Sequence, residues 1–467
     1  MFNKASQSFR VAAAEITDEK NAPAEIDRVL RDCFVKSCPV YIFLPIDLVD
    51  KPIPRSALEA PLNLEAEANP DGVKAAVDAI LECLYASKNP VVFVDCLVDR
   101  HAAVDELKAL LEKLQLPIYC SNMGKGIIDE NHPLYVSVYN GSVSAPGVSS
   151  NFENSDLPLV IGELPSDTNS GGFTRKTPKQ TCIFIDPAAV QIPNASKTYT
   201  HIPMKRVLAQ LTSTLDPARL PSNPVPILPE RPIEDDYDSK RIVQSYIWHR
   251  LARFFQPYDI VFGETGTAAF GLPDATFPPS TKWITQTYYG SIGYATPAAF
   301  GAETALAELA ETTTHPRSQN RGRTVLVTGD GSLMLTVQEI GNMIKQRQKV
   351  VVIIINNAGY TIERVIHGAR QSYNDIVPFN YAAMLSFFNM PEEQARRSFH
   401  RVETRAQLDE TLDKAELRRP EGVQVVEVVM DAMDVPWRLS SQLATRGPEA
   451  AEAMRKAGFK VREMHKW

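Results

Sequence analysis

Two short segments that are apolar on both faces constrain the fold of this chain most strongly. Residues 324–328 read Thr-Val-Leu-Val-Thr, and residues 350–355 contain only valine and isoleucine. A helical pattern from about Leu335 to Gln346 lies between them. Strands that lack a polar face belong inside a parallel sheet whose two faces are covered by helices. The C-terminal part of the chain is therefore predicted to fold as an α/β domain.

Residues 73–215 show the same alternation of helices and strands. Short apolar segments alternate with longer helical ones, which is the pattern of parallel α/β layers. This stretch is therefore predicted to form a second α/β domain. The predicted helices cover residues 73–86 and 102–114, and the predicted strands cover residues 90–95, 117–120, 157–162 and 181–186.

Proline marks the boundaries between these parts. Six prolines lie between residues 217 and 232, and because each removes a backbone donor and fixes φ, residues 216–237 are predicted to be an extended linker. A weaker, proline-containing break spans residues 51–72. The predicted organisation is a short N-terminal part (1–50) with a helix (24–36) and a strand (39–44), a central domain (73–215), the linker, and a C-terminal domain (238–467).

Composition excludes several classes of protein. Apolar residues make up 44% and charged residues 22% of the chain, the balance of an ordinary globular protein. A net charge of -7 argues against binding through nucleic-acid phosphates or an anionic membrane, and no apolar run approaches the ~20 residues of a membrane helix. The six cysteines and eight histidines lack metal-binding spacing, and the first ten residues do not resemble a secretory signal. We expect a cytoplasmic protein with a small-molecule partner.

Glycine and polar residues directly follow both apolar strands. Residues 329–332 read Gly-Asp-Gly-Ser after the first strand, and Asn356-Asn357 follows the second, with 24 residues between Gly331 and Asn356. The carboxyl ends of parallel strands meet at one edge of the sheet, where ligands bind in open α/β folds. The helix expected after Ser332 would direct free amides and its positive dipole end toward an anion. A phosphate group is therefore predicted at this edge.

The same segment offers oxygen ligands for a metal ion. Asp330 supplies a carboxylate, Asn357 a side-chain carbonyl and the Ala358-Gly359 turn a main-chain carbonyl, and such ligands suit Mg²⁺ that is shared with phosphate. Either motif alone is a common turn or loop, because glycine permits tight turns. At the ends of neighbouring strands, the two motifs together predict a magnesium diphosphate site.

The string GDGSLMLTVQEIGNMIKQRQKVVVIIINNAGYTIERVIHG, residues 329–368, resembles the thiamine diphosphate motif of pyruvate decarboxylase and its 2-oxo acid decarboxylase relatives. This resemblance implies parallel-sheet, three-layer α/β domains: a central domain and a diphosphate-binding domain, preceded in residues 1–50 by the C-terminal remnant of a pyrimidine-binding domain. Further segments resemble the same family, namely GETGTAAFG (263–271), YYGSIGYATPAAFGA (288–302), NPVVFVD (89–95), LPIYCSNMGKGIIDENHP (116–133) and residues 22–50.

The resemblance assigns roles to residues at the two strand ends. Asp330, Asn357 and the carbonyl oxygen of Gly359 would ligate Mg²⁺. Gly331 and Ser332 would contact the diphosphate of thiamine diphosphate. The implied cofactors are thus thiamine diphosphate and Mg²⁺.

The resemblance also places residues around the two rings of the cofactor. Ile292 would hold the cofactor bent, and Glu363 would be the catalytic residue that manages protons at the reacting centre. Ile362 and Tyr289 would form walls of the substrate pocket. The remaining cofactor-binding residues implied by the motifs are Thr267, Gly290, Ser291, Ala358, Tyr360 and Thr361.

The chain departs from the family at its N-terminal side. The family builds its active site between domains of two subunits, which implies a homodimer or homotetramer. The family's pyrimidine-binding glutamate and its adjacent pair of histidines have no counterpart, and residues 1–50 contain no histidine. Three explanations are open: the sequence lacks its beginning, a partner chain supplies the domain, or the chain is a noncatalytic relative.

The expected function is nonoxidative decarboxylation of pyruvate or a related 2-oxo acid to an aldehyde and CO2. One alternative is a carboligase of the acetolactate synthase type, which usually carries a flavin. Another is a cofactor-binding or regulatory subunit that is catalytically impaired. A Rossmann dehydrogenase is disfavoured because the chain lacks a GxGxxG motif.

Overall fold

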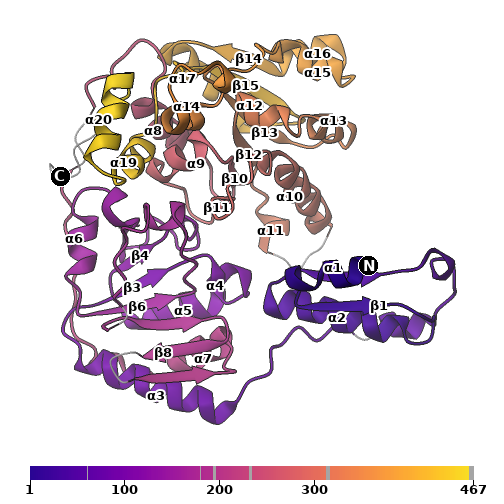
Figure 1. Ribbon diagram of the computed structural model, residues 1–467, viewed down its shortest axis with the longest axis vertical. Helices are drawn as coiled ribbons and strands as arrows, with labels where there is room; N and C mark the ends of the chain where they lie inside the picture. The colour runs from indigo at the N-terminus through magenta and orange to yellow at the C-terminus, as the bar shows by residue number, and fades with distance from the viewer. Residues whose placement is uncertain (60, 179, 193–195, 231–233, 312–315, 462–467) are drawn as a thin grey trace.

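The computed structural model describes residues 1–467 apart from 60, 179, 193–195, 231–233, 312–315 and 462–467. Within the described residues the strands form sheets of two, seven and six strands. Figure 1 shows the six-stranded sheet above the seven-stranded one, with the two-stranded unit to one side. The prediction of parallel-sheet α/β domains is confirmed.

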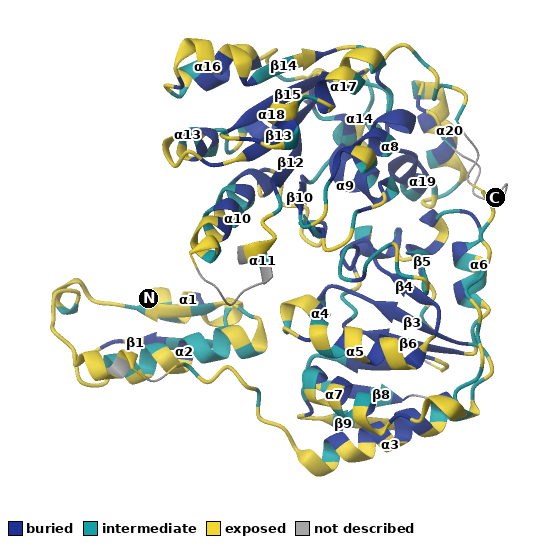
Figure 2. Cartoon of the chain, turned by 180° about the vertical axis from the view of Figure 1, so that it is seen from behind, coloured by how far each residue is buried: buried dark blue, intermediate teal, exposed yellow. Residues whose placement is uncertain are grey.

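A small N-terminal unit surrounds the two-stranded sheet. β1 (Ala12–Glu15) and β2 (Val40–Phe43) pair in parallel, with α2 (Ala22–Lys36) between them in sequence and α1 (Phe2–Ala5) ahead of them. Its buried core is small, and Figure 2 shows most of the unit as exposed or half-buried. The predicted helix 24–36 and strand 39–44 correspond to α2 and β2.

The middle domain holds the seven-stranded sheet. The strand order is β5-β4-β3-β6-β7-β8-β9, parallel from β5 to β7 and antiparallel from β7 to β9. Sequence patterns did not indicate β5, β8 and β9. The strands are β3 (Pro90–Val94), β4 (Ile118–Cys120), β5 (Tyr135–Val138), β6 (Leu157–Ile161), β7 (Ile183–Asp186), β8 (Ala189–Ile192) and β9 (Lys197–Thr200), and the helices are α3 (Pro70–Ala86), α4 (Leu97–Arg100), α5 (Val104–Leu114), α6 (Val148–Glu153) and α7 (Met204–Thr214).

The C-terminal domain holds the six-stranded sheet, which is parallel throughout and has the order β11-β10-β12-β13-β15-β14. The strands are β10 (Ile260–Gly263), β11 (Lys282–Thr285), β12 (Thr324–Gly329), β13 (Val350–Asn356), β14 (Phe399–Val402) and β15 (Gln424–Val429). The helices are α8 (Gln244–Phe254), α9 (Thr267–Gly271), α10 (Ala295–Ala310), α11 (Pro316–Gln319), α12 (Asp330–Met334), α13 (Gln338–Lys345), α14 (Thr361–His367), α15 (Met384–Phe387), α16 (Glu392–Arg397), α17 (Arg405–Leu412), α18 (Ala415–Arg418), α19 (Trp437–Ala444) and α20 (Pro448–Ala457).

The two apolar strands lie at the centre of this sheet, and their side chains pack into two separate hydrophobic cores. Alternate side chains of a strand point to opposite faces. In β13, Val351, Ile353 and Ile355 pack into one core, while Val352 and Ile354 pack into the core on the opposite face. Burial on both faces explains why the sequence of β13 shows no alternation of polar and apolar residues.

The helix predicted from about Leu335 to Gln346 corresponds to α13, which begins three residues later, at Gln338, and ends at Lys345. The preceding helix, α12, ends at Met334, and a bend separates the two. At the bend between them, the Thr336 amide donates to the Leu333 carbonyl three residues earlier, and the Thr336 hydroxyl donates to the Gly293 carbonyl at 2.9 Å. This second contact fixes the bend against a distant loop, which helical periodicity does not reveal.

The predicted linker, residues 216–237, contains a short 3-10 helix at Pro217–Arg219, and residues 221–230 are neither helix nor strand. Residues 231–233 of the linker, including Pro232, lie outside the described residues. No helix in the described part of the chain is long and apolar enough to cross a membrane.

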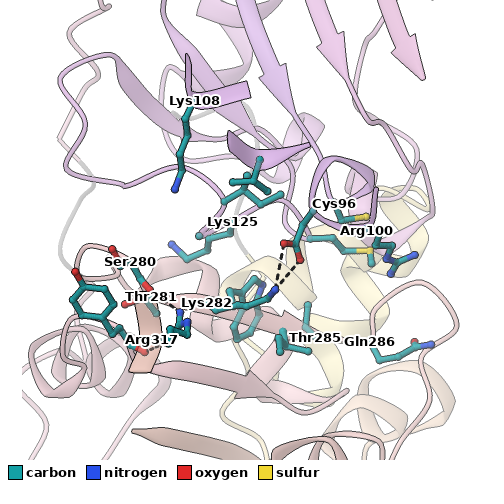
Figure 3. Close-up of a pocket in the computed structure, with 18 of the residues that line it drawn as sticks. Cys96, Arg100, Lys108, Lys125, Ser280, Thr281, Lys282, Thr285, Gln286 and Arg317 are labelled. Atoms are coloured by element: carbon teal, nitrogen blue, oxygen red, sulfur yellow. Dashed lines mark hydrogen bonds and ion pairs between the residues drawn. The ribbon is translucent and has the colours of Figure 1, made fainter. Parts of the chain in front are cut away.

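The middle and C-terminal domains meet through direct hydrogen bonds and ion pairs. The Trp283 indole donates to the Asn122 carbonyl at 3.1 Å, and Lys282 pairs with Asp99 at 3.0 Å (Figure 3). A cavity of about 660 Å³ lies beside this ion pair. Lysine and arginine side chains from both domains surround it, and none of the predicted site residues lines it.

Candidate active site

The predicted site residues converge at the carboxyl edge of the six-stranded sheet. A cavity of about 230 Å³ opens where β12 ends at Gly329 and β13 ends at Asn356. These strands are hydrogen-bonded neighbours, so their carboxyl ends lie side by side. The predicted residues that line the cavity are Thr267, Gly290, Ile292, Asp330, Gly331, Ser332, Asn357, Gly359, Tyr360, Thr361, Ile362 and Glu363.

Asp330 is the buried carboxylate of this cavity. It is 1% exposed, and its two oxygens accept hydrogen bonds from the amides of Gly331 at 2.8 Å and Gly359 at 2.9 Å. Burial raises the pKa of Asp330 to about 6, although these amide donors act in the opposite direction. No ion pair in the described part of the chain involves Asp330, so its charge lacks a cationic partner in the protein. A bound metal ion would supply one.

Two glycines allow close packing in the turns on either side of the cavity. A Cβ at Gly331 would come within 2.6 Å of the Tyr360 ring, and a Cβ at Gly359 would come within 2.3 Å of the Asn374 carbonyl oxygen. Gly359 also has φ of +128°, which other residues rarely adopt. These positions thus require glycine for close approach of backbone, as a phosphate-binding loop does.

Two polar side chains in the cavity are open to a ligand. Asn357 is 3% exposed and Ser332 is 7% exposed, and both line the cavity. In the described part of the chain neither side chain forms a hydrogen bond with another residue. Buried polar groups normally have partners, so an amide and a hydroxyl left open here indicate a polar ligand. Together with Asp330 they offer the oxygen atoms that suit Mg²⁺ and a diphosphate.

The opposite wall is built from two loops that precede helices. Thr267 is the first residue of α9, and Gly290 and Ile292 lie in the loop before α10. The Thr265 hydroxyl donates to the Gln286 carbonyl at 3.0 Å and so joins the two loops. This wall thus depends on the relative position of segments about twenty residues apart.

Helix α14 forms the third side of the cavity. It begins at Thr361, whose hydroxyl donates to the Ala432 carbonyl at 3.1 Å. Ile362 and Glu363, both half-buried, line the cavity from its first turn. An aliphatic group and a carboxyl group therefore face the space next to Ile292.

Three predicted residues do not line the cavity. Ser291 is exposed, and Tyr289 is 80% exposed, so neither forms a wall within this single chain. The side chain of Ala358 is also exposed, and Ala358 has a positive φ of 57°. Its carbonyl accepts from Arg364 at 2.8 Å, so its contribution is to the shape of the turn.

Glu264 is a residue that sequence reasoning missed. It follows β10 directly, is 1% exposed and accepts hydrogen bonds from the backbone of both wall-forming loops. A signal was present, because an acidic residue at the end of an apolar strand of a parallel sheet lies at the ligand-binding edge. Among the described residues there is no cluster of three or more His, Cys, Asp or Glu side chains that could hold a metal ion by themselves.

Comparison with known proteins gives two family matches. Residues 77–211 match the model described as thiamine pyrophosphate enzyme, central domain, and residues 263–428 match the C-terminal TPP binding domain. Pyruvate decarboxylase of Candida glabrata is 36% identical over 95% of this chain and 76% of its own length. Pyruvate decarboxylase isozyme 1 of Saccharomyces cerevisiae is 35% identical over the same shares, and pyruvate decarboxylase of Aspergillus terreus is 36% identical over 94% and 75%.

A solved structure has the same fold. The crystal structure of benzoylformate decarboxylase from Polynucleobacter necessarius superposes with a TM-score of 0.67 and 19% sequence identity. The match covers 92% of this chain and 77% of the other.

Proposed function

Because this chain belongs to the thiamine pyrophosphate enzymes, within the pyruvate decarboxylase family, we propose that it decarboxylates pyruvate or a related 2-oxo acid nonoxidatively to an aldehyde and CO2. The cofactors of the proposed reaction are thiamine diphosphate and Mg²⁺. The observation that carries the proposal is the cavity lined by Asp330, which has backbone amides but no cation as partners, together with the side chains of Asn357 and Ser332, which form no hydrogen bond with another residue in the described part of the chain.

In this proposal the diphosphate end is held at the two central strands. Asp330, Asn357 and the carbonyl of Gly359 ligate Mg²⁺, and the Ser332 hydroxyl and the Gly331 backbone contact the diphosphate. Glycine at 331 and 359 supports this assignment, since a Cβ would meet the Tyr360 ring or the Asn374 carbonyl and force open the turns that carry these ligands. Ala358, Tyr360 and Thr361 shape the turn that carries these ligands.

At the other end, Ile292, Thr267 and the Gly290-Ser291 backbone contact the rings. Thiamine diphosphate, when bound, supplies the electron sink that accepts the electron pair left behind by CO2. Glu363 holds or releases a proton at its carboxyl oxygens, and Ile362 excludes water from the reacting centre. The position of both residues on the first turn of α14, facing the cavity, supports these roles.

The proposal includes a homodimer or homotetramer. Tyr289 and Leu335, which flank the loop and the helix that line the cavity, are 80% and 54% exposed. Exposed apolar side chains beside a ligand site mark a surface that another protein covers. A second copy would bury Tyr289 against the active site, where sequence reasoning expects it. Sedimentation analysis measures the oligomeric state directly, and a monomer at micromolar concentration would contradict the proposed oligomer.

We also propose a cytoplasmic location for this reaction. All six cysteines are free, three of them buried, which suits a reducing compartment. Localisation of a tagged chain by microscopy tests this assignment.

The decisive experiment joins cofactor binding to turnover. Binding of thiamine diphosphate is measured by calorimetry with and without Mg²⁺, and CO2 release is measured from pyruvate, phenylpyruvate, indolepyruvate and a branched 2-oxo acid. We expect Mg²⁺-dependent binding and release of CO2 from at least one of these acids. Absence of cofactor binding would refute the proposal. Binding without turnover, rescued by a full-length relative, would instead identify a cofactor-binding subunit.

A further inference from the structure

We propose that Glu264 is a positioning residue that fixes, relative to each other, the two loops assigned to the rings of the cofactor. The inference rests on the proposed function, because it concerns the same cavity. Glu264 lies behind the cavity wall, and its carboxylate contacts the loops but does not line the cavity. It therefore acts through Thr265 to Thr267 on one side and Gly290 to Ile292 on the other.

The contacts of Glu264 join the two loops through a single carboxylate. One oxygen accepts from the Thr265 amide at 2.8 Å, and the other accepts from the Ala295 amide at 3.1 Å. The Gly293 amide also donates to this side chain. Thr265 belongs to the loop before α9, while Gly293 follows Ile292 directly and Ala295 is the first residue of α10. Each oxygen thus serves a different loop.

The backbone of Glu264 is fixed by the sheet. Its amide donates to the Val327 carbonyl of β12 at 2.9 Å, and its carbonyl accepts from the Ala269 amide at 3.2 Å. Val327 precedes Asp330 by three residues on the strand that carries the metal-binding carboxylate. Glu264 therefore links both ring-contacting loops to β12, the strand that ends directly before Asp330.

The carboxylate also meets the amino end of α10. Ala295 is the first residue of this sixteen-residue helix, and no side chain at the N-cap, Tyr294, caps it. The first amides of a helix lack intrahelical partners, and a negative charge there is favoured by the helix dipole. Glu264 supplies that acceptor from another part of the chain, which holds the start of α10, and hence Ile292, in place.

The charge of Glu264 has only neutral partners. No ion pair in the described part of the chain involves Glu264. Burial raises its pKa above the ordinary value, and the amides of Ala295, Thr265 and Gly293 oppose this rise. An acceptor with two usable oxygens is needed to serve two loops, and glutamine has only one side-chain oxygen.

The test uses Glu264→Gln and two probes in the presence of Mg²⁺. The first probe, thiamine diphosphate, contacts the loops and the metal site, whereas the second, inorganic pyrophosphate, contacts the metal site alone. Calorimetry should show at least tenfold weaker binding of thiamine diphosphate and, by competition, unchanged binding of pyrophosphate within twofold. Because the glutamine NH2 group faces backbone amides, the loops must separate, and the rings lose their contacts while Asp330 keeps its ligands.

Glu303→Gln is the matched control. Glu303 is a buried carboxylate of α10, 2% exposed, which accepts from the Thr324 hydroxyl at 2.9 Å and pairs with Arg321 away from the cavity. Its loss should lower the melting temperature but leave binding of both probes within twofold. Glu264→Asp is the second variant, in case Glu264→Gln does not fold. It keeps the charge but cannot span both loops, and it should bind thiamine diphosphate with intermediate affinity.

Two results would overturn the positioning role. The first is that a folded Glu264 variant binds thiamine diphosphate with an affinity within twofold of that of the unsubstituted chain. The second is that the variant loses affinity for thiamine diphosphate and pyrophosphate in equal proportion, as general destabilisation would cause. Failure of the unsubstituted chain to bind thiamine diphosphate at all would instead refute the proposed function, and this inference with it.

Discussion

In its proposed role Asp330 lies buried beside the diphosphate and is ionised to hold Mg²⁺. Substitution by alanine removes the buried carboxylate that lines the cavity together with Asn357 and Ser332. Asp330→Ala should therefore weaken Mg²⁺-dependent binding of thiamine diphosphate at least a hundredfold in calorimetry. The mutation also frees the amides of Gly331 and Gly359, so the fold is checked by circular dichroism. Unchanged binding in a folded variant would refute the metal assignment.

The buried state of Asp330 also makes stability depend on pH. Its pKa is raised to about 6 from an ordinary value of 3.8, so the folded metal-free protein binds this proton more tightly than the unfolded chain. The resulting stabilisation is complete below about pH 4 and is lost as the pH rises through 6. Relative to Asp330→Asn, the free energy of unfolding should fall by about 1.4 kcal/mol per pH unit between pH 4 and 6 and then level off. Urea titrations over this range measure it, and a flat difference would contradict the raised pKa.

Glu363 should separate turnover from binding. Its carboxyl lines the cavity from α14, whereas the proposed metal ligands lie before this helix. Glu363→Gln should keep thiamine diphosphate affinity within about threefold while lowering kcat about 10²- to 10⁴-fold, the usual effect of removing a general acid or base. Single-turnover CO2 release and calorimetry together measure both quantities. An equal loss of affinity and turnover would show that Glu363 is a binding residue.

At the scale of elements, the turn between β13 and α14 fixes the site through its backbone. Gly359 has φ of +128°, and a Cβ there would lie 2.3 Å from the Asn374 carbonyl. Gly359→Ala should therefore destabilise the protein by about 1–3 kcal/mol and reduce cofactor affinity. Gly301→Ala on α10 is the matched control, because nothing lies within 4 Å of a Cβ there and alanine favours helix. Equal unfolding free energies for the two variants in urea would contradict the strain argument.

The elements themselves were predictable where burial left a simple pattern. The strands at the centre of the six-stranded sheet are mostly apolar and buried on both faces, and both were predicted with the turns that follow them. β8 and β9 were not, because β9 is largely exposed and its residues Lys197–Thr200 carry no strand pattern. The end of β10 indicates that Glu264 lies at the ligand-binding edge, but its contact with Ala295, 31 residues away, could not be predicted. Hydrophobic periodicity along the sequence predicts which residues of an element are buried, but it does not predict hydrogen bonds between residues that are distant in the sequence.

At the scale of the whole molecule, buried polar contacts join the middle domain to the cofactor-binding domain. Arg438 of α19, 5% exposed, donates to the Val143 carbonyl at 2.7 Å and pairs with Asp274 at 3.0 Å. Asp274 in turn accepts from the Trp437 indole at 2.6 Å. This cluster lies beside α9, which begins at Thr267, so the domain interface supports one wall of the candidate active site.

Removing Arg438 should therefore uncouple the two domains. Arg438→Met removes the ion pair with Asp274 and the donor to the Val143 carbonyl, and breaking a buried pair costs about 3–5 kcal/mol. All four tryptophans lie after residue 238, and the Trp283 indole also contacts the Asn122 carbonyl of the middle domain. Tryptophan fluorescence therefore reports on the C-terminal domain and its interface, while far-ultraviolet circular dichroism reports on both domains. In thermal unfolding the two signals should coincide for the unsubstituted chain and separate for Arg438→Met. Arg396→Met, which removes an exposed pair with Glu392, is the control and should shift neither signal. Coincident transitions in Arg438→Met would show that this cluster does not couple the domains.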